Sequence, residues 1–99
     1  MAQKEIVWSD HAKLQFSNVL EFYFIRNGNA NYSLKILNDV EDLLTTLSRS
    51  EFIGRLATNK FTRVIVMDVY LIYYEINLNE IEIVSFWDNR QDSEKKKVR

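Results

Sequence analysis

The apolar residues of this chain change their spacing once, at about residue 60, and this change limits the fold more than any other feature. Before it, apolar residues recur every three or four positions, the period of an amphipathic helix; after it, they alternate with polar residues, as in a strand with one buried face. The chain has 99 residues, enough to bury one hydrophobic core. We therefore expect one α+β domain over residues 1–99.

The first half predicts a short strand followed by two helices. The strand is "EIVW" at residues 5–8, and Ser9 after it is a good N-cap for a helix from about Asp10 to Arg26. The segment "NGNAN" then breaks the pattern before a second helix with a stronger apolar stripe: Ile36, Leu37, Val40, Leu43, Leu44 and Leu47. Because the connection is short, the two helices should form an antiparallel hairpin.

The second half predicts a loop and three strands. Residues 48–60 follow neither period and should form a loop, with Phe52 and Ile53 tucked under it. The strands "TRVIVMD", "VYLIYYEIN" and "EIEIVSFW" follow in close succession and should form an antiparallel meander. The predicted order is β-α-α-β-β-β, with an antiparallel sheet packed on the helix hairpin.

One face of that sheet must cover the hairpin, which leaves the other face open. We expect Ile81 and Ile83 to face the core, and Tyr70 and Tyr74 to share a face that Tyr73 does not. The open face, bordered by the loop before Arg63 and by the "WDNRQD" end of the last strand, is the expected functional surface.

Several kinds of site are excluded or disfavoured by composition. The chain has no cysteine and one histidine, His11, which we expect at the surface of a helix's first turn, so no metal site is predicted. Its two glycines stand apart, so no phosphate-binding glycine loop exists and no cofactor is expected. No apolar run approaches the roughly 18 residues of a membrane helix, and the first ten residues lack a signal-peptide core, which favours a cytoplasmic protein with no membrane partner.

The net charge is −1, so no global positive field attracts nucleic acid. Basic residues nevertheless gather from Arg90 onward, and a basic tail is predicted at about residues 93–99. The acidic side chains Glu75, Glu80 and Glu82 could suggest paired acid–base catalysts, but we favour a solvated strand face and turn, because nothing apolar nearby in the sequence suggests a raised pKa.

Arg63 and Arg90 admit two interpretations. If the strands that carry them are neighbours, their guanidinium groups could converge at one rim and bind a phosphate or carboxylate. Alternatively, Arg63 pairs with Asp88 or Glu75 and Arg90 pairs with Asp92, in which case both arginines are structural.

The order and the residues together resemble the RelE/ParE toxin superfamily of bacterial type II toxin–antitoxin systems. The resemblance covers nearly the whole chain: "IVWSDHA", "FYFIRNGNANYSLKI", the Gly54 loop, "RVIVMDVYLIYYEI" and "IEIVSFWDNRQD". It implies a toxin that is neutralised by a cognate antitoxin and forms a toxin–antitoxin hetero-oligomer or a homodimer. Its members either cut messenger RNA in the ribosome or poison DNA gyrase.

The residues favour the ParE-like, gyrase-directed branch. The resemblance implies basic residues on the central strands of a ribonuclease, but this chain has Thr62, Val64 and Leu71 there. Only Arg63 and Arg90, with Lys60 in support, could act as catalytic residues if the protein were a ribosome-dependent endoribonuclease.

For target binding we expect residues near the end of the last strand and in the tail, together with Lys60: Trp87, Asp88, Arg90, Gln91, Lys95, Lys96 and Lys97. In this interpretation Trp87 buries its ring and Asp88 holds Arg90 or Arg63 in place. A third alternative is a binding module that sequesters an antitoxin without being toxic.

Overall fold

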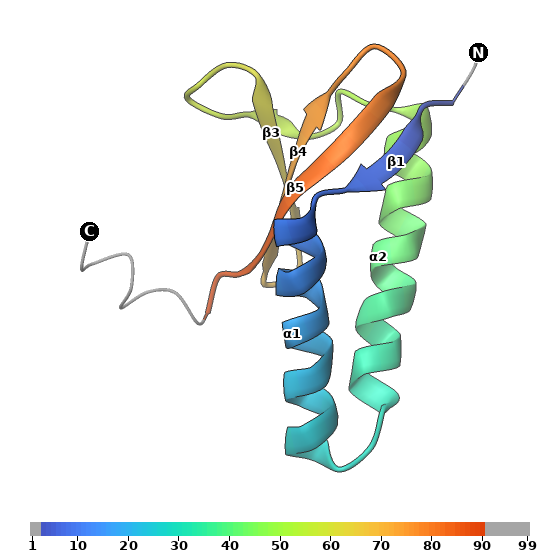
Figure 1. Ribbon diagram of the computed structural model, residues 1–99, viewed down its shortest axis with the longest axis vertical. Coiled ribbons are helices and arrows are strands. Elements are labelled where there is room, and N and C mark those ends of the chain that lie inside the picture. Colours follow the sequence, from blue (N-terminus) through green and yellow to red (C-terminus); the bar gives the residue numbers. More distant parts are fainter. Residues whose placement is uncertain (1–2, 91–99) are drawn as a thin grey trace.

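The computed structural model describes residues 3–90 as two helices and five strands (Figure 1). In chain order these elements are β1 (Glu5–Trp8), α1 (Asp10–Asn27), α2 (Asn31–Arg49), β2 (Arg55–Leu56), β3 (Thr62–Met67), β4 (Tyr70–Ile76) and β5 (Glu80–Asp88). The α+β fold and the two-helix hairpin predicted from the sequence are confirmed. The predicted loop at residues 48–60 contains the two-residue strand β2, which is too short to leave a period in the sequence.

The strands form one sheet in the order β1-β5-β4-β3-β2. The pairs β2–β3, β3–β4 and β4–β5 are antiparallel, as the meander predicts, whereas β1 runs parallel to β5. The sheet is therefore mixed. A parallel neighbour is possible for β1 because the connection from β1 to β5 contains the helix hairpin and the other three strands, which is long enough for a crossover.

Local sequence signals fix both ends of α1. The Ser9 side chain accepts a hydrogen bond from the backbone N–H of Ala12 at 3.0 Å, which caps the helix. At the other end Gly28 adopts a left-handed conformation, with φ 73°, and donates its N–H to Phe24 O at 3.0 Å. His11 lies exposed in the first turn, as expected.

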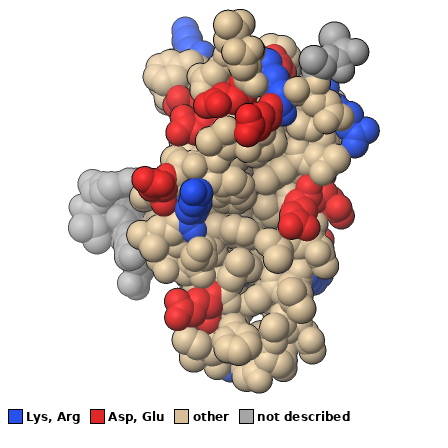
Figure 2. All heavy atoms as spheres, turned by 45° about the vertical axis from the view of Figure 1, so that its right-hand side comes forward, with Lys and Arg blue, Asp and Glu red and all other residues tan. Residues whose placement is uncertain are grey.

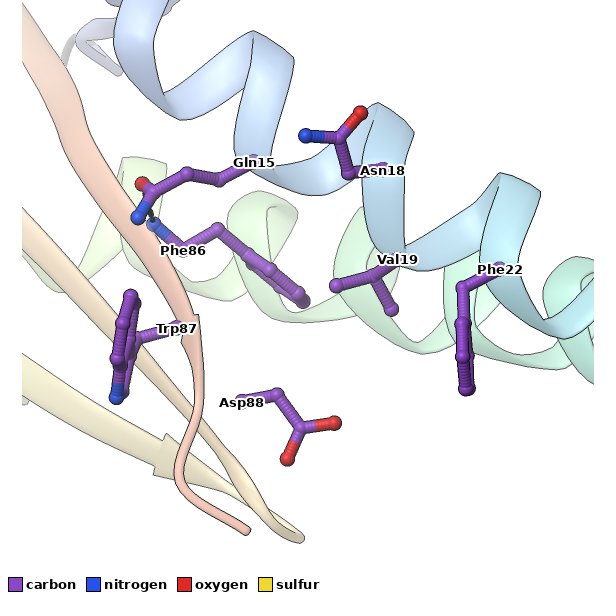
Figure 3. Close-up of a pocket in the computed structure, with 7 residues that line it drawn as sticks. All are labelled: Gln15, Asn18, Val19, Phe22, Phe86, Trp87 and Asp88. Carbon is purple, nitrogen blue, oxygen red and sulfur yellow. Dashed lines mark hydrogen bonds between the residues drawn. The ribbon is translucent and has the colours of Figure 1, made fainter. Parts of the chain in front are cut away.

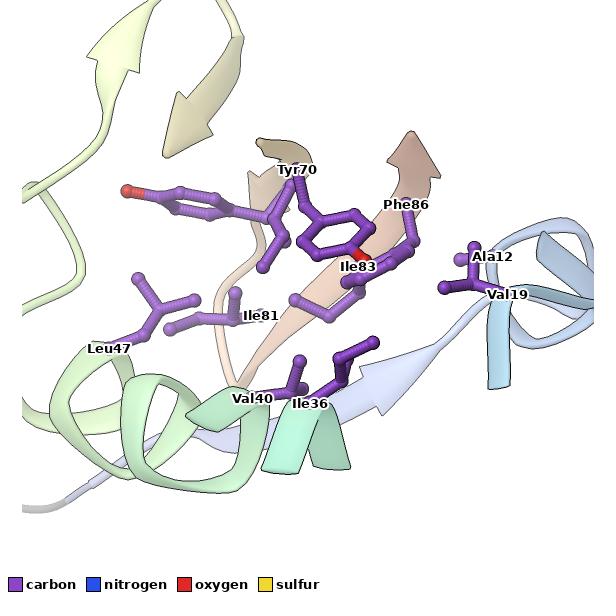
Figure 4. Close-up of a cluster of buried hydrophobic side chains, with 11 residues drawn as sticks. Ala12, Val19, Ile36, Val40, Leu47, Tyr70, Ile81, Ile83 and Phe86 are labelled. Atoms are coloured by element: carbon purple, nitrogen blue, oxygen red, sulfur yellow. The ribbon is translucent and has the colours of Figure 1, made fainter. Parts of the chain in front are cut away.

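The core lies between the helix hairpin and one face of the sheet (Figure 4). Its fully buried side chains come from four elements: Val40 and Leu47 from α2, Tyr70, Ile72 and Tyr74 from β4, Ile81, Ile83 and Phe86 from β5, and Ala12 from α1. Tyr70 and Tyr74 share the core face while Tyr73 lies on the opposite face, as predicted.

A β-bulge in β5 changes the predicted alternation. Tyr73 of β4 pairs with Ser85 whereas Tyr74 pairs with Ile83, so Val84 is the extra residue. Because of this shift, Phe86 and Asp88 join Ile81 and Ile83 on the core side, and Trp87 points to the open face. Trp87 is therefore only partly buried, and the expectation that its ring anchors this end of the strand is wrong; Phe86 does so instead.

The loop before β2 is fastened by Tyr74. The Tyr74 hydroxyl donates to Glu51 O at 2.7 Å and accepts from Gly54 N at 2.8 Å. Phe52 and Ile53, between these two anchor points, point outward and are 65% and 47% exposed. The expectation that they tuck under the loop is wrong, because the tyrosine ring already fills that space.

Candidate functional site

Half of β5 has an open edge. β1 pairs with Glu80–Ile83 alone, while β4 pairs with β5 as far as Asp88. Beyond Ile83, the side left by β1 faces the N-terminal part of α1, whose Gln15 side chain accepts hydrogen bonds from Phe86 N at 2.9 Å and Ser85 Oγ at 3.1 Å. Since strand backbone groups alternate in direction, the N–H and C=O of Asp88 point to the same side as those of Phe86.

A groove of about 280 Å³ follows this open edge, and we call it the β5–α1 groove (Figure 3). It is lined by four residues of α1 and three of β5: Gln15, Asn18, Val19, Phe22, Phe86, Trp87 and Asp88. Its walls combine apolar rings with backbone groups that no strand of residues 3–90 pairs. These are the features that a partner in an extended conformation can use when it adds to a sheet.

Arg90 is held at the end of this groove by Asp88. The Asp88 side chain is only 1% exposed, and its two oxygens accept from Arg90 Nε at 3.2 Å and Nη2 at 3.1 Å. Asp88 Oδ1 also accepts from the backbone N–H of Arg90 at 2.9 Å. The hydrogen bonds that the guanidinium of Arg90 donates to Asp88 raise the pKa of Arg90, which is therefore a fixed cation. The expectation that Asp88 holds Arg90 is confirmed by this geometry.

Three tyrosines surround the Arg90 side chain. Its Nη2 donates to the Tyr23 hydroxyl, and its guanidinium lies 5.8 Å from the Tyr23 ring centre and 5.9 Å from that of Tyr70. The hydroxyls of Tyr70 and Tyr32 are 3.3 Å apart. Burial, and next the contact with Tyr32, raise the pKa of Tyr70, so its hydroxyl stays protonated at a higher pH than an exposed tyrosine does.

On the outer side of these rings lies an open pocket of about 370 Å³, which we call the tyrosine–arginine pocket. It is lined by Tyr23, Arg26, Asn27, Tyr32 and Arg90.

The open face of the sheet carries an apolar strip. Val66 of β3, Leu71 of β4 and Trp87 of β5 are successive cross-strand partners, so their side chains lie in a row on this face. Val66 is 58% exposed, and Leu71 and Trp87 are partly buried. We call this row the open-face strip.

Arg63 and Arg90 do not converge. Arg63 pairs in register with Tyr74, whereas Asp88, just before Arg90, pairs with Tyr70. The two arginines therefore lie near opposite ends of β4, which are about 13 Å apart along that strand. The expectation of a shared rim is wrong because β3 and β5 both run antiparallel to β4, which places the start of β3 and the end of β5 at opposite ends of the sheet.

Arg63 has a structural environment, although not the expected ion pair. Its Nη1 donates to Gly54 O at 2.7 Å, and its guanidinium lies 4.9 Å from the Phe52 ring centre. Glu75, one of its expected partners, accepts instead from Thr62 Oγ1 at 2.9 Å.

Lys60 lies exposed in the loop before β3, at the same end of the sheet as Arg63, so the structure does not bring it near Trp87 or Arg90. Gln91, Asp92, Lys95, Lys96, Lys97 and the rest of the predicted basic tail lie outside the described residues.

Among the described residues, neither a patch of positive charge on the face in Figure 2 nor a cluster of metal ligands marks a binding site. On the face in Figure 2, the described lysines and arginines lie among acidic side chains and form no continuous patch. Within residues 3–90, no three histidine, aspartate or glutamate side chains gather as metal ligands would. In the same range, no helix is both long enough and apolar enough to cross a membrane.

Sequence reasoning missed Gln15, Tyr23 and Tyr32. Tyr23 lies at helical spacing from Val19 and Phe16, a pattern that by itself indicates packing, and Gln15 has no neighbouring signal in the sequence. Only the packing of the helices against the sheet brings Gln15 to Phe86, Tyr23 to Arg90 and Tyr32 to Tyr70.

Comparisons with known proteins agree with this architecture. The model of the family described as the ParE toxin of the type II toxin–antitoxin system parDE matches residues 6–93. A solved structure from the chromosomal ParDE system of P. aeruginosa has the same fold, with a TM-score of 0.71 and 16% sequence identity over 85% of this chain and 94% of that chain. A search of curated proteins gave no match. The chain therefore belongs to the ParE toxin family of type II toxin–antitoxin systems, the branch of the RelE/ParE superfamily that its sequence favours.

Proposed function

We propose that this protein is a toxin that arrests growth by binding DNA gyrase and is neutralised by a cognate antitoxin that occupies the β5–α1 groove. Membership of the ParE family supports the toxin role. The choice of gyrase over RNA is supported by the composition of the open face. At the positions where a ribonuclease of this superfamily is expected to carry basic residues, this chain has the uncharged Thr62, Val64 and Leu71, and Leu71 lies in the apolar open-face strip.

The open edge of β5 supports the antitoxin part of the proposal. An extended antitoxin segment beside Asp88 would satisfy backbone groups of β5 that no strand of residues 3–90 covers and would bury its apolar side chains against Val19 and Phe22. Docking by strand addition needs few side-chain contacts for affinity, because main-chain hydrogen bonds supply much of it.

A matched pair of variants tests this docking site. Asn18 and Asn38 are both exposed asparagines on helices, but only Asn18 lines the groove. Asn18→Arg should weaken binding of the cognate antitoxin by about tenfold or more, while Asn38→Arg leaves it unchanged, as measured by calorimetry. Equal affinities for the two variants would place the antitoxin elsewhere.

The geometry gives less support to the ribonuclease alternative. Phosphoryl chemistry on RNA needs cationic and proton-transferring groups around one phosphate, but Arg63 and Arg90 are at opposite ends of β4 and cannot contact the same phosphate. A protein target suits the apolar open-face strip better, because aromatic and aliphatic side chains dominate the buried centres of such interfaces.

Two assays separate the alternatives. Purified protein should inhibit DNA supercoiling by gyrase, and addition of the antitoxin should restore it. Primer extension after induction should show intact messages; codon-phased cuts would instead establish the ribosome-dependent endoribonuclease. Unchanged growth on induction without the antitoxin would favour the non-toxic binding module.

A further inference from the structure

We propose that the tyrosine–arginine pocket binds one carboxylate, an aspartate or glutamate side chain of the same extended partner segment that lies in the β5–α1 groove. The inference rests on the proposed docking of the antitoxin and adds a chemical requirement for the segment that binds. The pocket is formed by Tyr23, Arg26, Asn27, Tyr32 and Arg90.

The donors of this pocket are arranged in advance. Asp88 and Tyr23 fix Arg90 through its Nε and Nη2, so its Nη1 is left without a hydrogen bond to any residue from 3 to 90. A guanidinium already fixed in this way loses little conformational freedom when it binds a second anion. Tyr23 accepts from Arg90, so its own hydroxyl proton remains available as a donor.

The balance of charge favours a single carboxylate. Asp88 neutralises Arg90, and within residues 3–90 no carboxylate lies within ion-pair distance of Arg26, which leaves the pocket with one uncompensated positive charge. The nearest lysine along α2, Lys35, is paired with Asp39 at 2.8 Å, and Asp68 also lies close enough to raise the pKa of Lys35. A nucleic acid would place several phosphates against this mixed surface, where binding needs several unpaired cations.

The pocket continues the groove. Phe22 and Asp88 line the groove while their neighbours Tyr23 and Arg90 line the pocket, and the rings of Phe22 and Tyr23 touch with centres 4.9 Å apart. From Val19 or Phe22 to Arg26 is one to two turns of α1, about 6–10 Å. An extended chain covers this distance in roughly two or three residues. The acidic residue should therefore follow or precede the groove-filling apolar residue at that spacing.

Selection from a phage-displayed library of random peptides tests the proposal with the full-length protein. Three targets are compared: the unchanged protein, Arg26→Gln, and the control Lys13→Gln, an exposed lysine of α1 outside the pocket. Arg26 is the better choice for substitution because Arg90→Gln would leave the buried Asp88 without its ion pair. Peptides selected on the unchanged protein and on Lys13→Gln should be enriched in Asp or Glu near an apolar residue, and those selected on Arg26→Gln should not.

A synthetic peptide from the selection is then used in a double-mutant cycle that combines a change in its acidic residue with Arg26→Gln and measures binding affinity. Changing its acidic residue to the amide should weaken binding to the unchanged protein about fivefold and leave binding to Arg26→Gln unchanged. Absence of acidic enrichment, or an equal loss for both proteins, overturns the inference. Binding of a single-stranded DNA oligonucleotide that depends on Arg26 would also overturn it, in favour of a nucleic-acid site.

The outcome separates this inference from the proposed function. Some selected peptides could bind in the groove, as shown by weaker binding to Asn18→Arg, and yet lack acidic residues. Such peptides would refute the carboxylate site alone. Peptides unaffected by Asn18→Arg would refute the docking site and with it the inference. Neither result depends on whether the protein inhibits gyrase.

Discussion

Asp88 and Arg90 form a structural ion pair within the proposed functional site. From the sequence alone, Arg90 is a rim side chain whose removal should abolish growth arrest and hardly change stability, unless it is paired with an acidic residue. The structure shows that pair, with a buried carboxylate. The two properties must therefore be measured separately.

We predict that Arg90→Ala lowers the free energy of unfolding by about 1–3 kcal/mol, because it leaves the buried Asp88 carboxylate without its charged partner. Urea denaturation measures this change. Arg26→Ala is the matched control: it removes an exposed guanidinium that pairs with no carboxylate of residues 3–90, so stability should change by no more than about 0.5 kcal/mol. Equal stabilities of the two variants would show that Asp88 is satisfied without Arg90.

We predict that the buried hydroxyl of Tyr70 makes the folded protein less stable in alkaline solution. Burial, followed by the contact with Tyr32, raises the pKa of the folded-state hydroxyl above the value of about 10 for an unfolded chain. Above pH 10 the unfolded state therefore loses the proton first, and stability falls as pH rises. Between pH 10 and pH 11 this one group should cost up to about 1.4 kcal/mol.

Urea midpoints at pH 8 and pH 11 measure the effect, and Tyr70→Phe should reduce the difference between them. The control is Tyr73→Phe, on the open face. If stability falls between pH 8 and pH 11 by the same amount in Tyr70→Phe as in the unchanged protein, the fall is caused by other groups.

At the scale of helices and strands, the sequence predicts the features that depend on nearby residues, namely the helix ends and the turns. Ser9 and Gly28 mark the ends of α1, and Asp68 and residues 77–79 mark the turns of the meander, because capping and turn formation depend on nearby residues. The short strand β2, the parallel partner of β1 and the bulge at Val84 depend on contacts between distant segments, so no local pattern reveals them.

The same limit explains the candidate site. The sequence identifies Asp88 and Arg90 because they lie two positions apart, but it places Arg63 beside them because the order of strands across the sheet is not a local property. Gln15, Tyr23 and Tyr32 become part of the site only when the helices fold over β5.

The contact between the Gly54 loop and β4 should be intolerant of any side chain. A Cβ atom added at Gly54 would lie 2.7 Å from both Cε1 and the hydroxyl oxygen of Tyr74. We predict that Gly54→Ala costs about 1–3 kcal/mol of stability through this overlap. In a Tyr74→Phe background the cost should be smaller, because the hydroxyl is gone, and a double-mutant cycle by urea denaturation gives the coupling. Additive effects would mean that the loop moves away from the ring without cost.

The whole molecule presents apolar side chains on several surfaces that a partner could cover. Phe24, Ile25 and Leu34 of the helix hairpin are each more than half exposed, as are Phe52 and Phe61 on either side of β2. Together with the unpaired edge of β5, these side chains offer apolar surface and free backbone groups to a partner. The proposed antitoxin would cover only the part that lies along the groove.

The free protein should therefore self-associate, and the groove should contribute to the association. Sedimentation equilibrium should give an average mass above that of one chain, rising with concentration. Asn18→Arg, which places a charged side chain in the β5–α1 groove, should lower this mass, whereas Asn38→Arg on the outer surface of α2 should not.

Phe61→Lys tests the separate surface beside β2, where Phe61 is 65% exposed. If only Phe61→Lys reduces the mass, self-association uses the β2 side and leaves the groove free for the antitoxin. A single-chain mass at every concentration would show that the exposed apolar side chains are too scattered to hold two copies together.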